Sequence, residues 1–420
     1  MANFFDPPPE EPELFNAESL DDTDECVLCR DRDDVSALLG AGVVGAVTVT
    51  GGGWLKVLSA HTDRLNRLRK ITLALPDGAL REEIARRVGR HRCYTIDRPI
   101  REIDAEGDAM AVIAALADAV PYPIEGIVTV RDGLLVEHAR RPAPKTMTTG
   151  TLATDKVVRL PTEGRLIVVT GYPSSGKTSW CRFVMVHTAM NHNRRWCVFS
   201  PESQPWEEFA VQVAEVYMDK PFWPVNGLPR MSDTEIKAAE RWLGDKVVML
   251  VCDAEAQSPT LDWLLSRVTA CVLRNGITDF LIDPWNEVTQ ERGDMSETDF
   301  IGAALQRLKA FGLRHGVNIW VVAHPAKPMA KDGTRKAPGP YDISSSAQWF
   351  NKADVGLTVH SPERGLTELW AWKTRFRRFG EKNGRGIMQH NTVTGRYSDT
   401  DEEKAKHQWP DFFNRPEKQG

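Results

Sequence analysis

The sequence VVTGYPSSGKTSW, residues 168–180, places a run of β-branched residues directly before a turn rich in Gly, Pro and Ser. A Lys-Thr pair then opens a helical pattern. The spacing fits G-x-x-x-x-G-K-[ST], in which backbone N–H groups at a helix N-terminus surround the phosphates of a nucleotide. The alternative is a chance Ser- and Gly-rich turn, and the agreement of strand, turn and helix argues against it. The stretch therefore predicts a loop that binds a nucleoside triphosphate.

Within this loop, Lys177 is expected to supply a positive charge to the phosphates, and the Thr178 hydroxyl to bind Mg²⁺. We expect Mg²⁺ as the cofactor and ATP, or another NTP, as the substrate. The residues predicted to contact the nucleotide are Gly171, Ser174, Ser175, Gly176, Lys177, Thr178 and Ser179.

Further apolar runs follow the loop and are separated by long helical patterns such as TDFIGAALQRLKAFGLRHG, residues 298–316. Near-continuous apolar strands that alternate with helices predict an α/β fold with a parallel sheet covered by helices on both faces. Active groups in such sheets gather at the carboxyl ends of the strands. The predicted strands are contained in LIVVTG (166–171), RWCVFSPE (195–202), VVMLVCDA (247–254), DFLIDPW (279–285) and NIWVVAHP (318–325).

Three of these predicted strands end in side chains suited to phosphate chemistry. Asp283 is expected to hold Mg²⁺, although a lone Asp also caps turns. Glu202 is expected to orient the water that attacks the γ-phosphate, with a helix-capping role as the alternative. His324 is expected to hydrogen-bond the γ-phosphate and report its loss to the following loop, although a lone His is more often structural.

Basic residues gather in two later segments. The loop after His324 contains Lys327, Lys331, Arg335 and Lys336, and it is either a solvated surface loop or a binder of the nucleic-acid backbone. Lys373 and Arg375, in LWAWKTRFRRFG, are predicted on one face of a strand. They form a basic sheet edge or, in a ring, reach the γ-phosphate held by the neighbouring subunit.

Composition limits the class of protein. The 420 residues have 41% hydrophobic content and a formal net charge of −5, so any nucleic-acid contact needs a local basic patch. No apolar run approaches the ~20 residues that span a bilayer, so we expect no membrane protein. Seven cysteines, several of them in apolar runs, favour reduced thiols and a cytoplasmic location. No Lys or Arg precedes Arg30, which argues against a targeting peptide.

The N-terminal part predicts a smaller α/β unit. DVSALLGAGVVGAVTVTGGG and KITLALPDGALREEIARRVGRHRCYTID read as alternating helices and strands. CVLC, with Cys26 and Cys29, lacks the two further nearby ligands of a zinc site. The expected domains are an acidic disordered arm (1–25), an α/β domain (26–125), a linker (126–160), an NTPase domain (161–397) and a polar tail (398–420).

Six motifs in order carry a family resemblance: GYPSSGKT, FSPE, LIDPWNE, VVAHPAK, DISSSAQWFNKAD and WKTRF. Over about residues 150–397 the chain resembles the DnaB-like ring helicases, especially the phage primase-helicase and Twinkle-like types. The resemblance implies a RecA-like fold, a hexameric ring, NTP-driven movement along single-stranded DNA and replisome partners such as a primase or polymerase. It makes Glu202 the catalytic glutamate, His324 the phosphate sensor, Lys373 and Arg375 the pair acting in trans, and residues 327–347 the DNA-binding loop.

Residues 26–125 more weakly resemble the Toprim domain that precedes the helicase in those relatives. Arg30 stands where that family has a glutamate, and PDG leaves only Asp77 of an Asp-x-Asp pair. Primer synthesis needs such acidic residues to hold metal. We therefore expect no primase activity and a structural or subunit-docking role for this domain.

Two other functions fit the same phosphate loop. One is a RecA-like DNA-binding or strand-exchange ATPase that forms filaments. The other is a nucleotide-binding assembly factor, which requires an inert 327–347 loop. His324 and the Lys373–Arg375 pair favour the ring motor.

Overall fold

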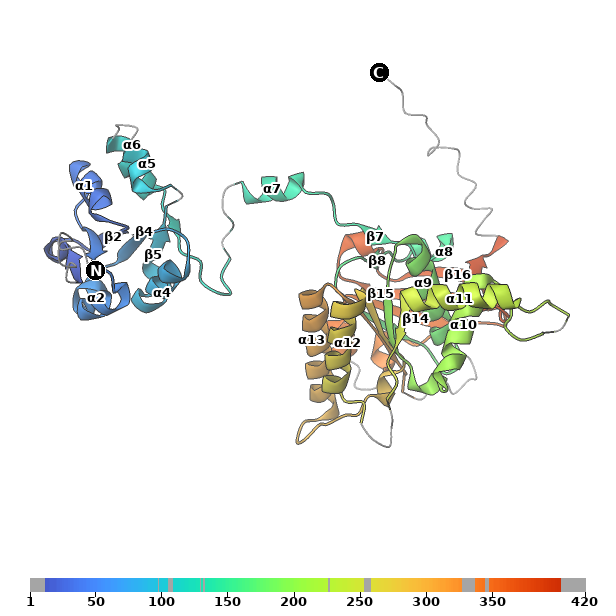
Figure 1. Ribbon diagram of the computed structural model, residues 1–420. Coiled ribbons are helices and arrows are strands. Elements are labelled where there is room, and N and C mark those ends of the chain that lie inside the picture. The colour runs from blue at the N-terminus through green and yellow to red at the C-terminus, as the bar shows by residue number, and fades with distance from the viewer. Residues whose placement is uncertain are drawn as a thin grey trace, which may run out of the picture. The chain divides into compact units, whose positions relative to one another are not determined.

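The computed structural model divides the chain into two compact units, Met1–Arg141 and Pro142–Gly420 (Figure 1). Each unit has its own sheet and its own hydrophobic cores. The structure describes residues 12–96, 98–104, 109–128, 130, 133–225, 227–252, 258–326, 337–343 and 347–401.

The first unit is built on a six-stranded sheet with the order β1-β3-β2-β4-β5-β6. β3, β2, β4 and β5 are parallel, whereas the edge strands β1 and β6 are antiparallel to their neighbours. One face packs against α2, α3 and α4, and the other against α1, α5 and α6. The elements are β1 (Glu13–Phe15), β2 (Glu25–Cys29), α1 (Arg32–Gly40), β3 (Ala46–Thr50), α2 (Trp54–Ala60), α3 (Thr62–Arg67), β4 (Lys70–Ala74), α4 (Ala79–Val88), β5 (Cys93–Thr95), α5 (Ile100–Asp104), α6 (Ala109–Ala117), β6 (Val120–Pro121) and α7 (Leu134–Arg140).

Part of the expected disordered arm belongs to this unit. Residues 1–11 lie outside the described residues, but β1 pairs with β3, and Leu14 and Leu20 are buried. This packing was not predicted because acidic residues surround the two leucines and a short edge strand buries few side chains. The description of all of residues 1–25 as an arm is therefore wrong.

Cys26 and Cys29 both lie on β2 but pack into the cores on opposite faces of the sheet. Burial raises the pKa of Cys26 to about 12 and raises that of Cys29 further. Two thiols on opposite faces cannot share one zinc ion, and both behave as small apolar core residues.

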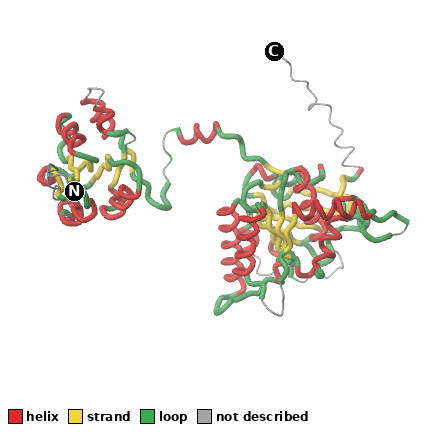
Figure 2. The backbone as a smooth tube through the Cα atoms, in the orientation of Figure 1, coloured by secondary structure: helices red, strands yellow, loops and turns green. Residues whose placement is uncertain are grey.

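The second unit is built on a nine-stranded sheet with the order β11-β10-β12-β13-β9-β14-β15-β16-β17, covered by helices on both sides (Figure 2). The strands from β11 to β14 in this order are parallel, which confirms the predicted α/β class. Three antiparallel strands, β15 to β17, extend the sheet. The strands are β9 (Leu166–Thr170), β10 (Trp196–Phe199), β11 (Val247–Met249), β12 (Asp279–Ile282), β13 (Asn318–Ala323), β14 (Val355–His360), β15 (Leu366–Thr374), β16 (Gly384–His390) and β17 (Tyr397–Asp399), with β7 (Thr146–Met147) pairing with β8 (Leu160–Pro161) apart from them.

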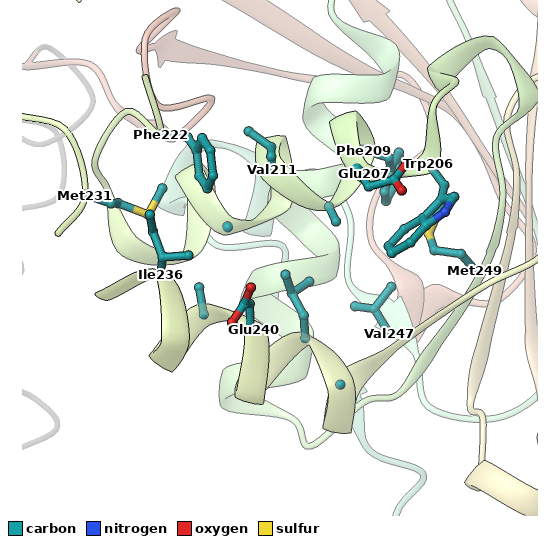
Figure 3. Close-up of a pocket in the computed structure, with 15 residues that line it drawn as sticks. Trp206, Glu207, Phe209, Val211, Phe222, Met231, Ile236, Glu240, Val247 and Met249 are labelled. Carbon is teal, nitrogen blue, oxygen red and sulfur yellow. The ribbon is translucent and has the colours of Figure 1, made fainter. Parts of the chain in front are cut away.

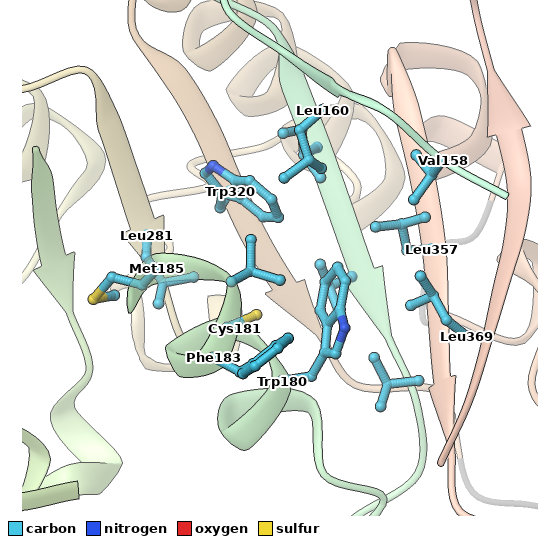
Figure 4. Close-up of a cluster of buried hydrophobic side chains, with 14 of the residues drawn as sticks. Val158, Leu160, Trp180, Cys181, Phe183, Met185, Leu281, Trp320, Leu357 and Leu369 are labelled. Carbon is cyan, nitrogen blue, oxygen red and sulfur yellow. The ribbon is translucent and has the colours of Figure 1, made fainter. Parts of the chain in front are cut away.

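Helices cover this sheet because its strands are apolar on both faces. Side chains of α9 and α10 pack on one face, and those of α12, α13 and α14 on the other. Trp180 of α9 lies against Trp320 of β13, with ring centroids 6.4 Å apart, and close to Leu357 of β14 (Figure 4). The helices are α8 (Leu152–Asp155), α9 (Lys177–Asn191), α10 (Trp206–Met218), α11 (Asp233–Lys246), α12 (Leu261–Asn275), α13 (Glu297–His315) and α14 (Ala347–Lys352).

The second unit begins earlier than the expected domain start at residue 161. Residues 142–160, expected as linker, include β7 and α8, and Val157 and Val158 are buried in the main core. Thr149, Thr151 and Thr154 are fully or almost fully buried and bond to one another. This packing was not predicted because the segment has few large apolar residues. The threonines can be buried because they satisfy each other's polar groups.

The expected C-terminal tail also contributes to the fold at its start. Ser398 and Asp399 lie in β17, and the Asp399 carboxylate accepts hydrogen bonds from the backbone N–H groups of Leu152 and Ala153. The carboxylate thereby pairs two of the free amides at the start of α8. Residues 402–420 lie outside the described residues.

A buried carboxylate links β12 and β13 to the segment before β10 at the amino end of the sheet. Asp279 on β12 is fully buried and accepts hydrogen bonds from Arg194 Nε (2.6 Å), Asn318 Nδ2 (3.0 Å) and Trp320 Nε1 (3.0 Å). Because every donor points at one charged group, removing that charge leaves Arg194 without its counter-ion.

Asp279→Asn is therefore expected to lower the free energy of unfolding by about 3 kcal/mol, the usual cost of breaking a buried pair. Urea denaturation followed by tryptophan fluorescence measures the loss. Asp245→Asn is the matched control, because Asp245 forms an exposed pair with Arg195, and it should leave stability almost unchanged. Equal losses in the two variants would contradict this account.

Candidate functional site

The predicted phosphate loop connects the central strand β9 to α9. Gly171 has φ 155° and Gly176, directly before α9, has φ 89°, which are conformations that L side chains rarely adopt. A Cβ at Gly171 would collide with the carbonyl oxygen of Val359. The loop closes on itself, since Lys177 Nζ donates to the Tyr172 carbonyl oxygen at 2.9 Å. The glycines thus allow a tight turn whose backbone amides start a helix.

A cavity of about 430 Å³ lies over this loop. Glu202, which follows β10, and His324, which follows β13, line it together with the loop. Such a volume is typical of small-molecule sites. The other lining residues are Pro173, Ser174, Gly176, Lys177, Thr178 and Ser179.

Asp283 directly follows β12 and is only 3% exposed. Burial raises its pKa, while a hydrogen bond from the Thr178 hydroxyl and the nearby charges of Arg182 and Lys177 lower it. Its Oδ2 atom is buried and has no hydrogen-bond partner among the described residues. A carboxylate oxygen next to a hydroxyl fits Mg²⁺, which binds through one or two protein oxygens together with substrate phosphates.

The protein offers no self-sufficient metal site within the described ranges, since no group of three or more His, Cys, Asp or Glu there is arranged to hold an ion. Mg²⁺ at Thr178 and Asp283 therefore fits as an ion that arrives with the nucleotide. When bound, it would offset phosphate charge.

Glu202 and His324 differ in their surroundings. Glu202 is exposed in a short 3₁₀ helix, Pro201–Ser203, with its side chain free to meet water at the cavity. Burial and the nearby charge of Lys177 lower the pKa of His324, and Glu287 opposes them. The imidazole is thus neutral at neutral pH, and its Nδ1 has no hydrogen-bond partner in the described part of the chain. A neutral imidazole can donate one hydrogen bond to a phosphate oxygen.

Arg182 is a site residue that the sequence reasoning missed. It lies one helical turn after Thr178 on α9, its charge acts on Asp283, and its Nη2 donates to Ser203 Oγ at 3.4 Å. Its guanidinium also stacks on Phe209, 4.9 Å from the ring centroid. Arg182 thereby links Asp283, the carboxylate predicted to hold Mg²⁺, to the segment that carries Glu202. The spacing of four residues from Thr178 was the available signal.

Lys373 and Arg375 are together but far from this cavity. Lys373 Nζ donates to the carbonyl oxygens of Phe350 and Asn351, and Arg375 Nη2 also donates to that of Asn351. Burial and the neighbouring Arg375 lower the pKa of Lys373 to about 8. Arg375 lies one residue beyond β15, not within the strand as predicted.

The register of the sheet fixes the distance between Arg375 and the phosphate loop. The Arg375 N–H donates to the Asp354 carbonyl oxygen, and the Asp354 N–H donates to the carbonyl oxygen of Leu166, at the start of β9. The phosphate loop follows Thr170, at the other end of that strand. Four residues of strand correspond to about 13 Å. Arg375 and the phosphate loop thus lie at opposite ends of β9, which puts Arg375 out of reach of the phosphate loop of the same chain.

Asp354 holds the Arg375 side chain in place. This carboxylate is fully buried, and its Oδ1 pairs with Arg375 Nε (2.7 Å) and Lys309 Nζ (2.6 Å). The Arg375 side chain nevertheless stays 39% exposed. An oriented and partly exposed guanidinium is suited to contact a partner.

The predicted DNA-binding residues Lys327, Lys331, Arg335 and Lys336 lie outside the described residues. The base of their loop is described: Pro325 bridges Ile343, and the Ala326 N–H donates to the Asp342 carbonyl oxygen at 2.6 Å. The predicted loop, residues 327–347, therefore starts three residues after His324.

A second pocket is apolar and lies between α10 and α11 (Figure 3). Trp206, Phe209 and Met249 line it, and among its described lining residues Glu207 and Glu240 are the charged ones. These described residues include no cation or hydroxyl that would bind phosphate, so the chemistry of this lining differs from that of the loop cavity. In the described part of the chain, no helix combines the length and apolar character needed to cross a membrane.

Comparison with known proteins identifies relatives. No family model matches the chain. A Twinkle homolog protein, chloroplastic/mitochondrial, from Arabidopsis thaliana is 30% identical over 435 aligned positions, which cover 92% of this chain and 60% of that protein. The chain thus spans about three fifths of the length of this curated relative.

Solved structures with a similar fold include the ATPase domain of G40P (TM-score 0.52, 13% identity, 63% of this chain and 95% of that chain). A DnaB-like replicative helicase, solved in a study of its interactions with primase, gives a TM-score of 0.54 at 13% identity over 72% of this chain and 74% of that chain. These matches show that the second unit has the RecA-like ATPase fold. The chain is thus similar in sequence to the Twinkle homologue over most of its own length and similar in fold to DnaB-like helicases.

Proposed function

We propose that the chain is an NTP-driven DNA helicase that moves along single-stranded DNA as a homo-oligomeric ring of six subunits. Its substrate is ATP and its cofactor is Mg²⁺. The sequence similarity to the Twinkle homologue supports helicase activity. One observation supports the proposal of a ring. The phosphate-loop cavity contains Lys177, Glu202 and His324, whereas Arg375 lies at the opposite end of β9. A catalytic arginine must then come from a second copy.

In the proposed mechanism, Lys177 and the loop amides bind the phosphates, and Thr178 and Asp283 hold Mg²⁺. Glu202 orients the attacking water and accepts its proton. Arg375 of the adjacent subunit offsets the charge that builds on the γ-phosphate, and Lys373 assists it. The chemistry is therefore shared across a subunit boundary.

His324 supplies the proposed link between hydrolysis and DNA movement. Its imidazole donates to the γ-phosphate, and loss of that group frees the hydrogen bond. The basic loop, with Lys327, Lys331, Arg335 and Lys336, begins two residues beyond Pro325 and is anchored at its base. A change at His324 thus passes along a very short length of chain to the residues that hold the DNA backbone.

The first unit is proposed to make no primers. In its resemblance to a Toprim domain, Arg30 replaces a glutamate and only Asp77 of the Asp-x-Asp pair remains, and Asp77 pairs with Arg81. Template-dependent ribonucleotide synthesis that requires Asp77 would contradict this part of the proposal.

Single-stranded DNA is expected to stimulate ATP hydrolysis several-fold, because DNA binding and phosphate release share the segment after His324. The measurement is the rate of phosphate release with and without an oligothymidylate, with duplex DNA of equal phosphate content as the control. Electron microscopy with nucleotide distinguishes closed rings from filaments. Open filaments, or hydrolysis unaffected by single-stranded DNA, would argue against a ring helicase.

A further inference from the structure

Two cysteines of the second unit meet between the sheet and α12. Cys197 lies on β10 and is fully buried, and Cys271 lies near the C-terminal end of α12 and is half-buried. Both belong to the same hydrophobic core. The proposed helicase activity uses neither thiol.

The pattern of each element directs the two side chains toward one another. Side chains alternate between the two faces along β10, and Cys197 and Phe199 point into the core that α12 covers. On α12, Cys271 comes one helical turn after Val268 and two turns after Leu264, both of which are buried. Cys271 therefore lies on the face of α12 that packs against the sheet.

A ring contact shows which parts of the strand and the helix are neighbours. Phe199, at the end of β10, lies against Trp263, near the start of α12, with ring centroids 6.3 Å apart. From this contact β10 runs back to Cys197, whereas α12 runs forward to Cys271 and toward the start of β12, which is parallel to β10. Both cysteines thus lie toward the amino end of these strands. There the Cys197 thiol donates a hydrogen bond to the Cys271 sulfur.

This contact makes Cys271 the more reactive thiol of the pair. The hydrogen bond from Cys197 lowers the pKa of Cys271 to about 7, burial opposes this effect, and the charge of Arg274 adds to it. The same hydrogen bond, together with burial, raises the pKa of Cys197. The nucleophile in thiol chemistry is the thiolate. Cys271 is thus partly ionised at neutral pH and reaches solvent, whereas Cys197 stays protonated and enclosed.

We propose that Cys197 and Cys271 form a redox modification site, at which a hydroperoxide such as hydrogen peroxide oxidises the pair to a disulfide. The Cys271 thiolate attacks one peroxide oxygen, the O–O bond breaks, and the leaving oxygen takes up a proton to form water. The Cys197 sulfur then attacks the sulfenic acid on Cys271. An S–S bond forms, the S–O bond breaks, and hydroxide leaves as water with the Cys197 proton. The two thiols together lose two electrons, and hydrogen peroxide becomes two molecules of water.

The disulfide joins α12 to the strand that leads to Glu202. A dithiol reductant reverses it by thiol–disulfide exchange. The modification is independent of nucleotide binding, because neither cysteine lines the cavity over the phosphate loop.

Peptide mapping of the full-length chain tests the proposal. The folded protein is treated with hydrogen peroxide, its remaining thiols are blocked with iodoacetamide in denaturant, and trypsin digestion follows without reductant. We expect a linked pair of peptides, residues 196–230 and 268–274, that separates when dithiothreitol is added. A chain oxidised in urea is the reference, because the contact between the two thiols is then lost and the seven cysteines pair without this preference.

Two variants separate the roles of the thiols. Cys197→Ala should leave Cys271 as a sulfenic acid that dimedone labels, whereas Cys271→Ser should leave the enclosed Cys197 unoxidised. Cys252→Ser is the matched control, because Cys252 is also half-buried and packs on the same core, and the variant should form the link as the wild type does. Circular dichroism verifies that each variant is folded.

The pH dependence of iodoacetamide labelling at Cys271 measures the contact itself. The labelling rate should rise with pH with a midpoint at about 7, and Cys197→Ala should move the midpoint upward because the thiolate loses its hydrogen-bond donor. An unchanged midpoint in Cys197→Ala would overturn the proposal. So would the absence of the linked peptides after peroxide treatment, a bond from Cys271 to another cysteine, or a disulfide between two copies of the chain on a non-reducing gel.

Discussion

Lys177→Ala is expected to reduce NTP hydrolysis to background. Lys177 is the cation of the loop cavity, and its Nζ is held over the turn by the Tyr172 carbonyl oxygen, where the phosphates are proposed to lie. Its loss removes charge stabilisation in both the bound and the reacting state. Phosphate release under saturating Mg²⁺–ATP measures the effect. Hydrolysis close to the wild-type rate would show that the cavity over this loop is not the nucleotide site.

Glu202→Gln separates binding from chemistry in the same cavity. The amide keeps the size of the side chain but accepts a proton poorly, so hydrolysis should fall about 10²-fold or more while nucleotide still binds. Fluorescent-nucleotide titration measures binding beside the hydrolysis assay. Glu208→Gln is the control, since Glu208 is exposed on α10 and does not line the cavity. If Glu202→Gln hydrolyses at the wild-type rate, the catalytic assignment fails.

Arg375→Ala is expected to bind nucleotide normally and to hydrolyse it about 10³-fold more slowly, as for other arginines that act in trans. The side chain lies at the far end of β9 from its own phosphate loop, so truncation leaves that loop intact. Lys309 still pairs with Asp354 in the variant, which keeps this buried carboxylate compensated. The fold should therefore persist, as thermal unfolding would verify.

The matched control for Arg375 is Arg377→Ala. Arg377 is also exposed and lies two residues further along, in the 3₁₀ helix Arg377–Phe379. Removing it changes the net charge by the same amount but leaves the Asp354 contact in place. Equal losses of hydrolysis in the two variants would indicate a general charge effect and not a trans-acting arginine.

Much of the second unit could be predicted because its signals are local. The strand, turn and helix around Gly171–Thr178 are encoded within a few residues, and apolar runs mark the buried parallel strands. The antiparallel strands β15 to β17 depend on pairing between distant segments, and their register is not a local property. The packing of Val157 and Val158 was missed for the same reason, since their partners come from elsewhere in the chain.

In the candidate site, too, locally encoded residues could be predicted, whereas features that depend on distant segments could not. Asp283, Glu202 and His324 each end an apolar run, and the order of the strands brings these ends together. Arg182 was missed because its role arises from the contact with Ser203 and the charge of Asp283, neither of which is adjacent in sequence. The separation of Arg375 from its own loop follows from the β14–β15 register, which no motif specifies.

The most direct test of the shared site is a mixture of Lys177→Ala and Arg375→Ala chains. A mixed ring contains some interfaces that combine an intact phosphate loop on one copy with an intact Arg375 on its neighbour, whereas neither variant alone has any. Subunit exchange is first demonstrated with labelled chains. We predict that hydrolysis by the mixture clearly exceeds the sum of the two separate variants. If the chains are shown to mix and no activity returns, Arg375 does not complete a neighbour's site and the account of a ring motor is contradicted.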